Sequence, residues 1–209
     1  MEQKETYWSR FAADFEERNY YVVGKSDVEL ILNKVASLKN LKNVLELGCG
    51  NGTYSKVLAK NADSLLATDL SEEMVEASKS RLKTFVNIRV EKADCFNLPY
   101  SSNSFDTVFM ANLIHIIPRP EDAIRECERV LKKGGRLIII SYTQKGMKFR
   151  YKIGLIYRYL KTYGKSPKGG RNFGLEDAIS LFKIDEFKVT DAELIGEKSK
   201  ALFVKGQKK

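Results

Sequence analysis

The most informative feature of this sequence is a short apolar run that is followed directly by three alternating glycines. Residues Val44 to Leu47 are aliphatic except for Glu46, which is typical of a parallel strand buried on both faces. Gly48, Gly50 and Gly52 let the backbone turn sharply and let a ligand approach the main chain, with the N–H groups of a following helix aimed at it. The pattern predicts a nucleotide-type binding turn in an α/β fold.

The glycine spacing does not identify the ligand, because Thr53 stands where the dinucleotide fingerprint requires a third spaced glycine. Three acidic residues narrow the choice: Glu46, Asp69 and Asp94 each lie at the end of an apolar run. In an open α/β sheet these strand ends share one crevice, and carboxylates only accept hydrogen bonds. They disfavour the pyrophosphate of NAD and favour a ligand with an ammonium, a ribose diol and an adenine amine, such as S-adenosylmethionine. The alternative for either aspartate is that it caps the next turn.

Five sequence blocks resemble the class I S-adenosylmethionine-dependent methyltransferases and occur in that family's order. They span roughly Leu41 to Ser141, with a weaker match to the end, and lie at residues 44–52, 67–71, 93–99, 105–108 and 130–137. The resemblance implies a Rossmann-like, doubly wound, seven-stranded sheet. That sheet is mostly parallel, ends in a C-terminal antiparallel hairpin and carries helices on both faces.

The same resemblance implies S-adenosylmethionine as the cofactor and S-adenosylhomocysteine as the product. The residues implied to contact the cofactor are Glu46, Gly48, Cys49, Gly50, Gly52, Asp69, Leu70, Met74, Asp94, Cys95 and Asn112. Met74 could equally be a core methionine, since methionine fills apolar gaps readily. Asp106 is usually structural in such sequences and is left out of the site.

His115 is the only histidine and follows an expected strand, Phe105 to Ala111, at the edge where an acceptor should bind. A general base is needed only if the acceptor is a hydroxyl or a protonated amine, and His115 is the candidate for it. The alternative is a packed histidine within its apolar surroundings.

Length and composition favour a single domain over residues 1–209, since a chain that is 43% hydrophobic can bury one sizeable core. Cys49, Cys95 and Cys127 are odd in number and far apart, which argues against disulfides and a zinc site. Without a leader or a membrane-length apolar stretch, we expect a soluble, cytoplasmic protein.

The net charge of +9 is concentrated in one block. Residues 141–172 hold nine Lys or Arg and no Asp or Glu. Within an insertion at 145–174, Phe149, Ile153, Ile156, Tyr157 and Leu160 recur with helical period, which predicts a basic amphipathic helix over 148–165. Such a block can attract nucleic acid, anionic lipid or an acidic substrate. A glycine-rich loop is expected over 165–174.

Segment 1–24 carries an aromatic stripe at helical spacing, Trp8, Phe11 and Phe15. The stripe either docks a terminal helix or forms a lid over the cofactor. Next, Ser26 and Glu29 predict a capping box at the start of a helix.

Later elements follow from periodicity and turn residues. We expect a helix over 121–131 ended by Gly134, a strand over 137–140, a short helix over 175–182, and a hairpin of strands 187–195 and 201–204.

The resemblance implies a methyltransferase that moves a methyl group by in-line displacement to a small-molecule acceptor, and the basic block favours an acidic or amphiphilic one. One alternative keeps the enzyme but makes the acceptor RNA or protein, bound through the basic block 145–171. Another is a non-catalytic module that binds an adenosyl ligand or RNA.

Overall fold

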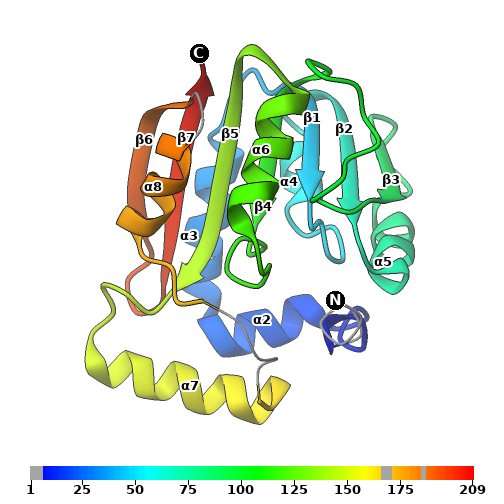
Figure 1. Ribbon diagram of the computed structural model, residues 1–209. Helices are drawn as coiled ribbons and strands as arrows, with labels where there is room; N and C mark the ends of the chain where they lie inside the picture. Colours follow the sequence, from blue (N-terminus) through cyan, green and yellow to red (C-terminus); the bar gives the residue numbers. More distant parts are fainter. Residues whose placement is uncertain (1–6, 166–170, 185–186) are drawn as a thin grey trace.

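A seven-stranded sheet with strand order β3-β2-β1-β4-β5-β7-β6 forms the centre of the molecule (Figure 1). The computed structural model describes residues 7–165, 171–184 and 187–209. The strands are β1 Lys42–Leu47, β2 Ala62–Asp69, β3 Ile88–Lys92, β4 Phe105–Ala111, β5 Leu131–Thr143, β6 Phe187–Ile195 and β7 Lys200–Lys208. The helices are α2 Phe15–Val23, α3 Lys25–Ala36, α4 Ser55–Leu58, α5 Glu72–Leu82, α6 Pro120–Val130, α7 Phe149–Tyr163 and α8 Leu175–Ile184.

Strands β1 to β5 pair in parallel, whereas β7 runs antiparallel to both β5 and β6. The predicted fold class, including the C-terminal antiparallel hairpin, is therefore confirmed. Strands β4 and β6 also have the predicted boundaries.

The two sheet faces are buried by different helices. Along β4, Val108 and Met110 face the core formed with α6 and α8, whereas Phe109 and Ala111 face the core formed with α3 and α4. Successive side chains of a strand point to opposite faces, so an uninterrupted apolar run is covered on both sides. The run in β4 is thus explained by its central position in the sheet.

Two predicted local features are wrong. Helix α6 ends at Val130 and β5 begins at Leu131, so Gly134 lies within a long strand and does not end the helix. The capping box does not form either, since α3 begins at Lys25 after Gly24. The buried carboxylate of Asp27 instead accepts N–H bonds from residues 197–199, in the turn between β6 and β7. Those long-range bonds outweigh a local cap.

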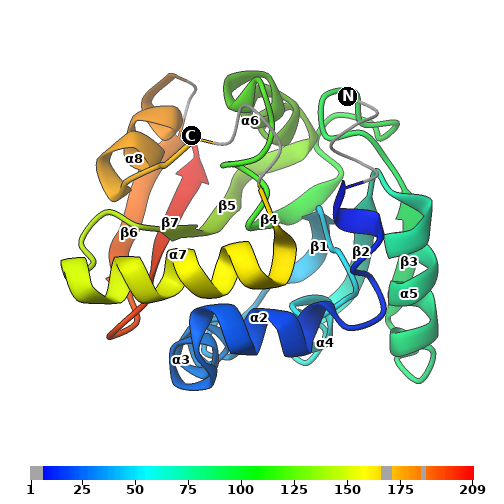
Figure 2. The same ribbon diagram turned by 90° about the horizontal axis from the view of Figure 1, so that it is seen from below.

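Helices α2 and α7 lie side by side across the edge at which the parallel strands end (Figures 1 and 2). Arg158 of α7 donates to the carbonyl of Val22, and Arg18 of α2 donates to that of Thr162. The buried ring of Tyr163 packs against an aromatic cluster of Trp8, Phe11, Phe15 and Tyr159.

The aromatic stripe does not lie on one helix, contrary to its spacing, because turns span residues 10–14. The basic helix is present as α7. The loop expected over 165–174 falls partly outside the described residues.

Candidate active site

The glycine turn after β1 is open toward solvent at its centre. Gly50 has a φ of 55°, and a Cβ atom placed there would meet nothing within 4 Å. At Gly48 a Cβ atom would come within 3.1 Å of Leu113, and at Gly52 within 2.9 Å of Ser78. The outer glycines therefore permit close packing, while Gly50 leaves room for a ligand against the main chain. The Leu113 contact also places the loop after β4 against this turn.

Glu46 lies beneath the turn with one carboxylate oxygen unpaired. Its Oε2 atom accepts a hydrogen bond of 2.5 Å from Ser55, whereas its buried Oε1 atom has no partner among the described residues. The pKa of Glu46 is raised to about 8, mainly by burial and in part by the charge of Asp69, while the Ser55 hydrogen bond opposes the rise. A buried acceptor without a donor is costly, so a ligand that brings a donor or a positive charge fits this position.

Asp69 ends β2 and fixes the glycine turn. Its Oδ2 atom accepts the N–H of Gly50 at 2.9 Å, and its Oδ1 atom accepts that of Ser71 at 3.0 Å. Asp94 follows β3 and accepts the N–H of Phe96 at 2.9 Å. Both aspartates thus make the turn-capping bond that the alternative interpretation required, and Asp69 also contacts the candidate ligand turn.

The acidic residues lie near one another at the strand ends, as expected. Asp69 raises the pKa of Glu46. The pKa of Cys95 is raised to about 12, mainly by burial and in part by the charges of Asp94 and Asp69. Because β2 pairs with β1 on one side and with β3 on the other, Asp69 lies between Glu46 and the Asp94 turn.

The other predicted contacts have mixed surroundings. Met74 is buried in α5, and its N–H donates to the capping Ser71. Cys49 is buried, with its N–H bonded to the carbonyl of Thr68, while Leu70 is half-buried. Asn112 joins the ends of β4 and β5, because its Oδ1 atom accepts the N–H of Tyr142 at 3.0 Å. The oxygen of Asn112 is therefore engaged within the protein.

His115 lies beyond Asn112, and its Nδ1 atom is 2.8 Å from the Ser141 hydroxyl. Burial lowers the pKa of His115 to about 4, so the ring is neutral at neutral pH. Asp106 lies at the opposite edge, at the start of β4, where Lys132 donates to it at 2.9 Å. That arrangement agrees with its exclusion from the site.

The N-terminal segment reaches the site through residues that sequence reasoning missed. The hydroxyls of Ser9 and Ser71 are 2.7 Å apart, and Arg81 of α5 forms an ion pair with Glu16 of α2. A groove of about 340 Å³ beside these contacts is lined by Ala12, Ala13, Asn51, Ala77, Ser80 and Arg81. Only a long-range contact identifies Ser9, since an isolated serine carries no sequence signal.

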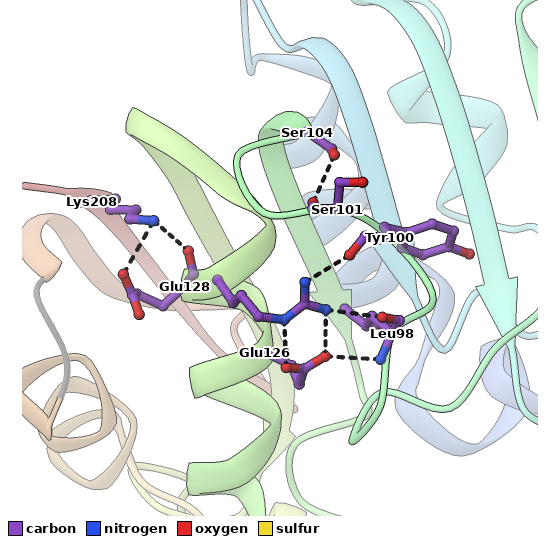
Figure 3. Close-up of polar contacts among 8 residues, drawn as sticks. Leu98, Tyr100, Ser101, Ser104, Glu126, Glu128 and Lys208 are labelled. Carbon is purple, nitrogen blue, oxygen red and sulfur yellow. Dashed lines mark hydrogen bonds and ion pairs between the residues drawn. The ribbon is translucent and has the colours of Figure 1, made fainter.

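The loop that carries Asp94 is held against α6 (Figure 3). Arg129 donates to the carbonyls of Tyr100 and Leu98 at 2.7 and 2.9 Å. Glu126 pairs with Arg129 and also accepts the N–H of Leu98. On the same helix, the carbonyl of Glu128 accepts a hydrogen bond from Lys208 of β7, as Figure 3 also shows. The network fixes the Asp94 loop relative to the sheet.

Comparison with known proteins agrees with this geometry. Residues 45–139 match a family model described as a methyltransferase domain. The chain is 33% identical to a demethylmenaquinone methyltransferase of Clavibacter sepedonicus over 49% of this chain and 42% of that protein. It is 31% identical to a ubiquinone/menaquinone biosynthesis C-methyltransferase of Rickettsia prowazekii over 62% of this chain and 54% of that protein. The chain thus spans about half the length of the curated relatives it matches.

A solved structure covers nearly the whole chain. It is a Thermotoga maritima protein described as an S-adenosylmethionine-dependent methyltransferase, possible histamine N-methyltransferase. The identity is 26%, the TM-score is 0.71, and the match covers 98% of this chain and 99% of that one. The glycine turn, the clustered acids, the sheet order and these similarities together support a class I S-adenosylmethionine-dependent methyltransferase.

Proposed function

We propose that this chain transfers a methyl group from S-adenosylmethionine to a small-molecule acceptor. The observation that carries the proposal is the unpaired, buried Oε1 atom of Glu46, in the strand that leads directly into the open glycine turn at Gly50. A cationic, hydrogen-bond-donating ligand can pair with that oxygen, whereas a pyrophosphate has no donor to offer it.

We assign the cofactor contacts by chemical type. Glu46 serves the ammonium end, Asp69 the ribose diol, and the Asp94 turn with Cys95 the adenine. The remaining proposed contacts are Gly48, Cys49, Gly50, Gly52, Leu70, Met74 and Asn112. The oxygen of Asn112 already accepts from the N–H of Tyr142, and we assign its amide N–H₂ group to the cofactor.

When bound, S-adenosylmethionine supplies a methyl group already activated on a sulfonium. The protein's own contribution is then mainly to hold the reactants in line and to exclude water. We assign that task to segment 1–24 as a lid and to the insertion 145–174, within a single domain. The Ser9 to Ser71 contact and the bond from the Tyr7 hydroxyl to the carbonyl of Tyr163 support this assignment for the described residues.

For the acceptor, we propose an amphiphilic small molecule of the quinone-related kind. The names of the curated relatives support this class, as does the aromatic cluster that flanks the site. We propose His115 as the group that accepts a proton from the acceptor, since its neutral ring lies beyond the carboxyl end of β4.

Thermal unfolding with S-adenosylhomocysteine, and separately with NAD, tests the cofactor. Ligand at about 100 times its dissociation constant adds about 2.7 kcal/mol. For a chain of this size that is a rise of roughly 5 to 10 °C, expected with S-adenosylhomocysteine only.

The Asp69→Ala variant tests the site. It should weaken binding by about 1 to 3 kcal/mol in calorimetry, because ligand donors lose a charged partner. Asp106→Ala, at the opposite edge, is the matched control. A rise in the unfolding temperature with NAD instead of S-adenosylhomocysteine would contradict the cofactor assignment. Unchanged affinity for S-adenosylhomocysteine in a folded Asp69→Ala protein would contradict the site assignment. Transfer of labelled methyl groups to hydroxylated quinone analogues then tests the acceptor class.

A further inference from the structure

The outer face of α7 is the most apolar exposed surface of any described element. Within the described ranges, five of the nine large hydrophobic residues that are exposed belong to this helix. They are Phe149, Ile153, Ile156, Tyr157 and Leu160, with exposed fractions of 77, 54, 42, 64 and 50%. Their spacing places them along one side of the helix, and we call them the apolar stripe.

The orientation of the stripe is fixed by contacts between α7 and the N-terminal segment. Arg158 donates to the carbonyl of Val22, and Tyr7 and Arg18 donate to carbonyls in the last turn of the helix. Tyr163 is buried in the aromatic cluster. Turning the apolar stripe inward would break all of these contacts, so it is a stable part of the surface.

Basic side chains flank the apolar stripe. Lys148, Arg150, Lys161 and Lys165 are exposed and Lys152 is half-buried, while residues 141–172 contain no acid. Lysine and arginine can lay their apolar stems along an apolar surface and keep the charge at its border. An apolar strip with basic borders is the arrangement of helices that lie in the plane of a membrane interface.

We propose that the outer face of α7 docks on the surface of an anionic lipid bilayer. The helix would lie in the headgroup layer with the apolar stripe inserted and the lysines at the phosphates. Spanning is not required, and no helix within the described residues is long and apolar enough to cross a membrane. The proposal rests on this surface and is independent of the proposed methyl transfer.

Other occupants fit the surface less well. RNA would satisfy the basic residues but would leave the apolar stripe facing phosphates. A second copy packed face to face would bring two sets of unbalanced basic residues together, and like charges in an interface are costly. An anionic bilayer satisfies both the apolar centre and the basic border.

Co-sedimentation with vesicles tests the proposal. The full chain should bind vesicles of phosphatidylcholine mixed with phosphatidylglycerol, and should bind them less at high salt and on pure phosphatidylcholine. Neutralising Lys152 or Lys161 to Gln should lower the partition coefficient about fivefold each. The triple substitution Phe149→Ser, Ile153→Ser, Leu160→Ser should lower it by about a hundredfold or more.

The matched control is Val86→Ser, which removes a fully exposed apolar side chain far from α7 in sequence and should leave binding unchanged. Thermal unfolding of each variant should match the parent protein, since the altered side chains are on the surface. Equal vesicle binding by the triple variant would overturn the proposal. So would a concentration-dependent dimer in sedimentation that the triple variant abolishes, or binding of single-stranded RNA but not of anionic vesicles.

Discussion

At the scale of single residues, Glu46 has the least usual environment in the candidate site. It is buried with one oxygen unpaired, and its raised pKa leaves the carboxyl largely protonated at neutral pH. The unpaired oxygen that suits Glu46 to bind a ligand therefore lowers the stability of the ligand-free protein. A cofactor ammonium would remove that conflict.

The stability of the free protein should fall as pH rises toward 8. The pKa of Glu46 is raised in the folded state, so its contribution is fully present below its unfolded value of 4.5 and is lost by about pH 8. Glu46→Gln should flatten this slope, measured as the free energy of unfolding in urea. The lowered pKa of His115 makes the free energy of unfolding rise with pH up to about 6.5. The fall caused by Glu46 is therefore best measured between pH 6.5 and 8, above the pKa of His115 in both states.

The exposed Glu72→Gln is the control and should keep the parent slope. A second readout is proton release when S-adenosylhomocysteine binds near pH 7, detected by calorimetry in buffers of different ionisation enthalpy. Parent and Glu46→Gln proteins with the same slope and the same proton release would refute the assignment.

His115 gives a prediction about rate. With a pKa of about 4, a proton-accepting His115 keeps the methyl-transfer rate flat between pH 6 and 8. His115→Asn should then lower kcat by about a hundredfold, the low end for general base catalysis, because so weak a base has little driving force. If His115 only packs in the core, His115→Asn will instead lower the stability of the protein and leave kcat unchanged. A parent rate that rises with a pKa between 6 and 7 would contradict the role.

At the scale of elements, the contact between α6 and the Asp94 loop is held by few side chains. Arg129→Ala removes two bonds to main-chain carbonyls and leaves Glu126 without its cation. We expect a loss of about 1 to 3 kcal/mol in the free energy of unfolding. Amide exchange over residues 95–104 should speed up, and cofactor affinity should fall.

Arg125→Ala is a close control, since Arg125 lies on the same helix and pairs with Asp122 on the surface. Exposed pairs contribute little, so its cost should stay below about 0.5 kcal/mol. Equal losses in both variants would show that the loop does not depend on Arg129.

At the scale of the whole molecule, local patterns predicted the sheet and its binding edge. The apolar runs predicted β1 and β4, and the glycines predicted the turn after β1, because a strand buried on both faces has a recognisable sequence pattern. The long β5 was underestimated, since Lys132, Lys133 and Gly134 suggest a loop. Leu131 nevertheless pairs with Phe105 of β4, and pairing with β4 and β7 resumes at Arg136, so the segment between them continues the strand.

Contacts between distant segments could not be predicted. Periodicity identified α7 as amphipathic but not which side faces the protein, and its apolar stripe points outward. Asp27 lies inside the predicted capping box without a role in it, yet its carboxylate accepts N–H bonds from residues about 170 positions away. The Ser9 to Ser71 contact depends likewise on how the ends of the chain return to the sheet.

The position of β7 between β5 and β6 has a consequence for biosynthesis. Strand β6 leaves the ribosome first, but its neighbour in the sheet is the strand made after it. Until residues 200–208 emerge, β5 keeps an open apolar edge and β6 has no partner. Such unpaired edges are prone to aggregate. A nascent chain stalled before Lys200 should therefore depend on chaperones, whereas a chain in which residues 200–208 have emerged can close its sheet.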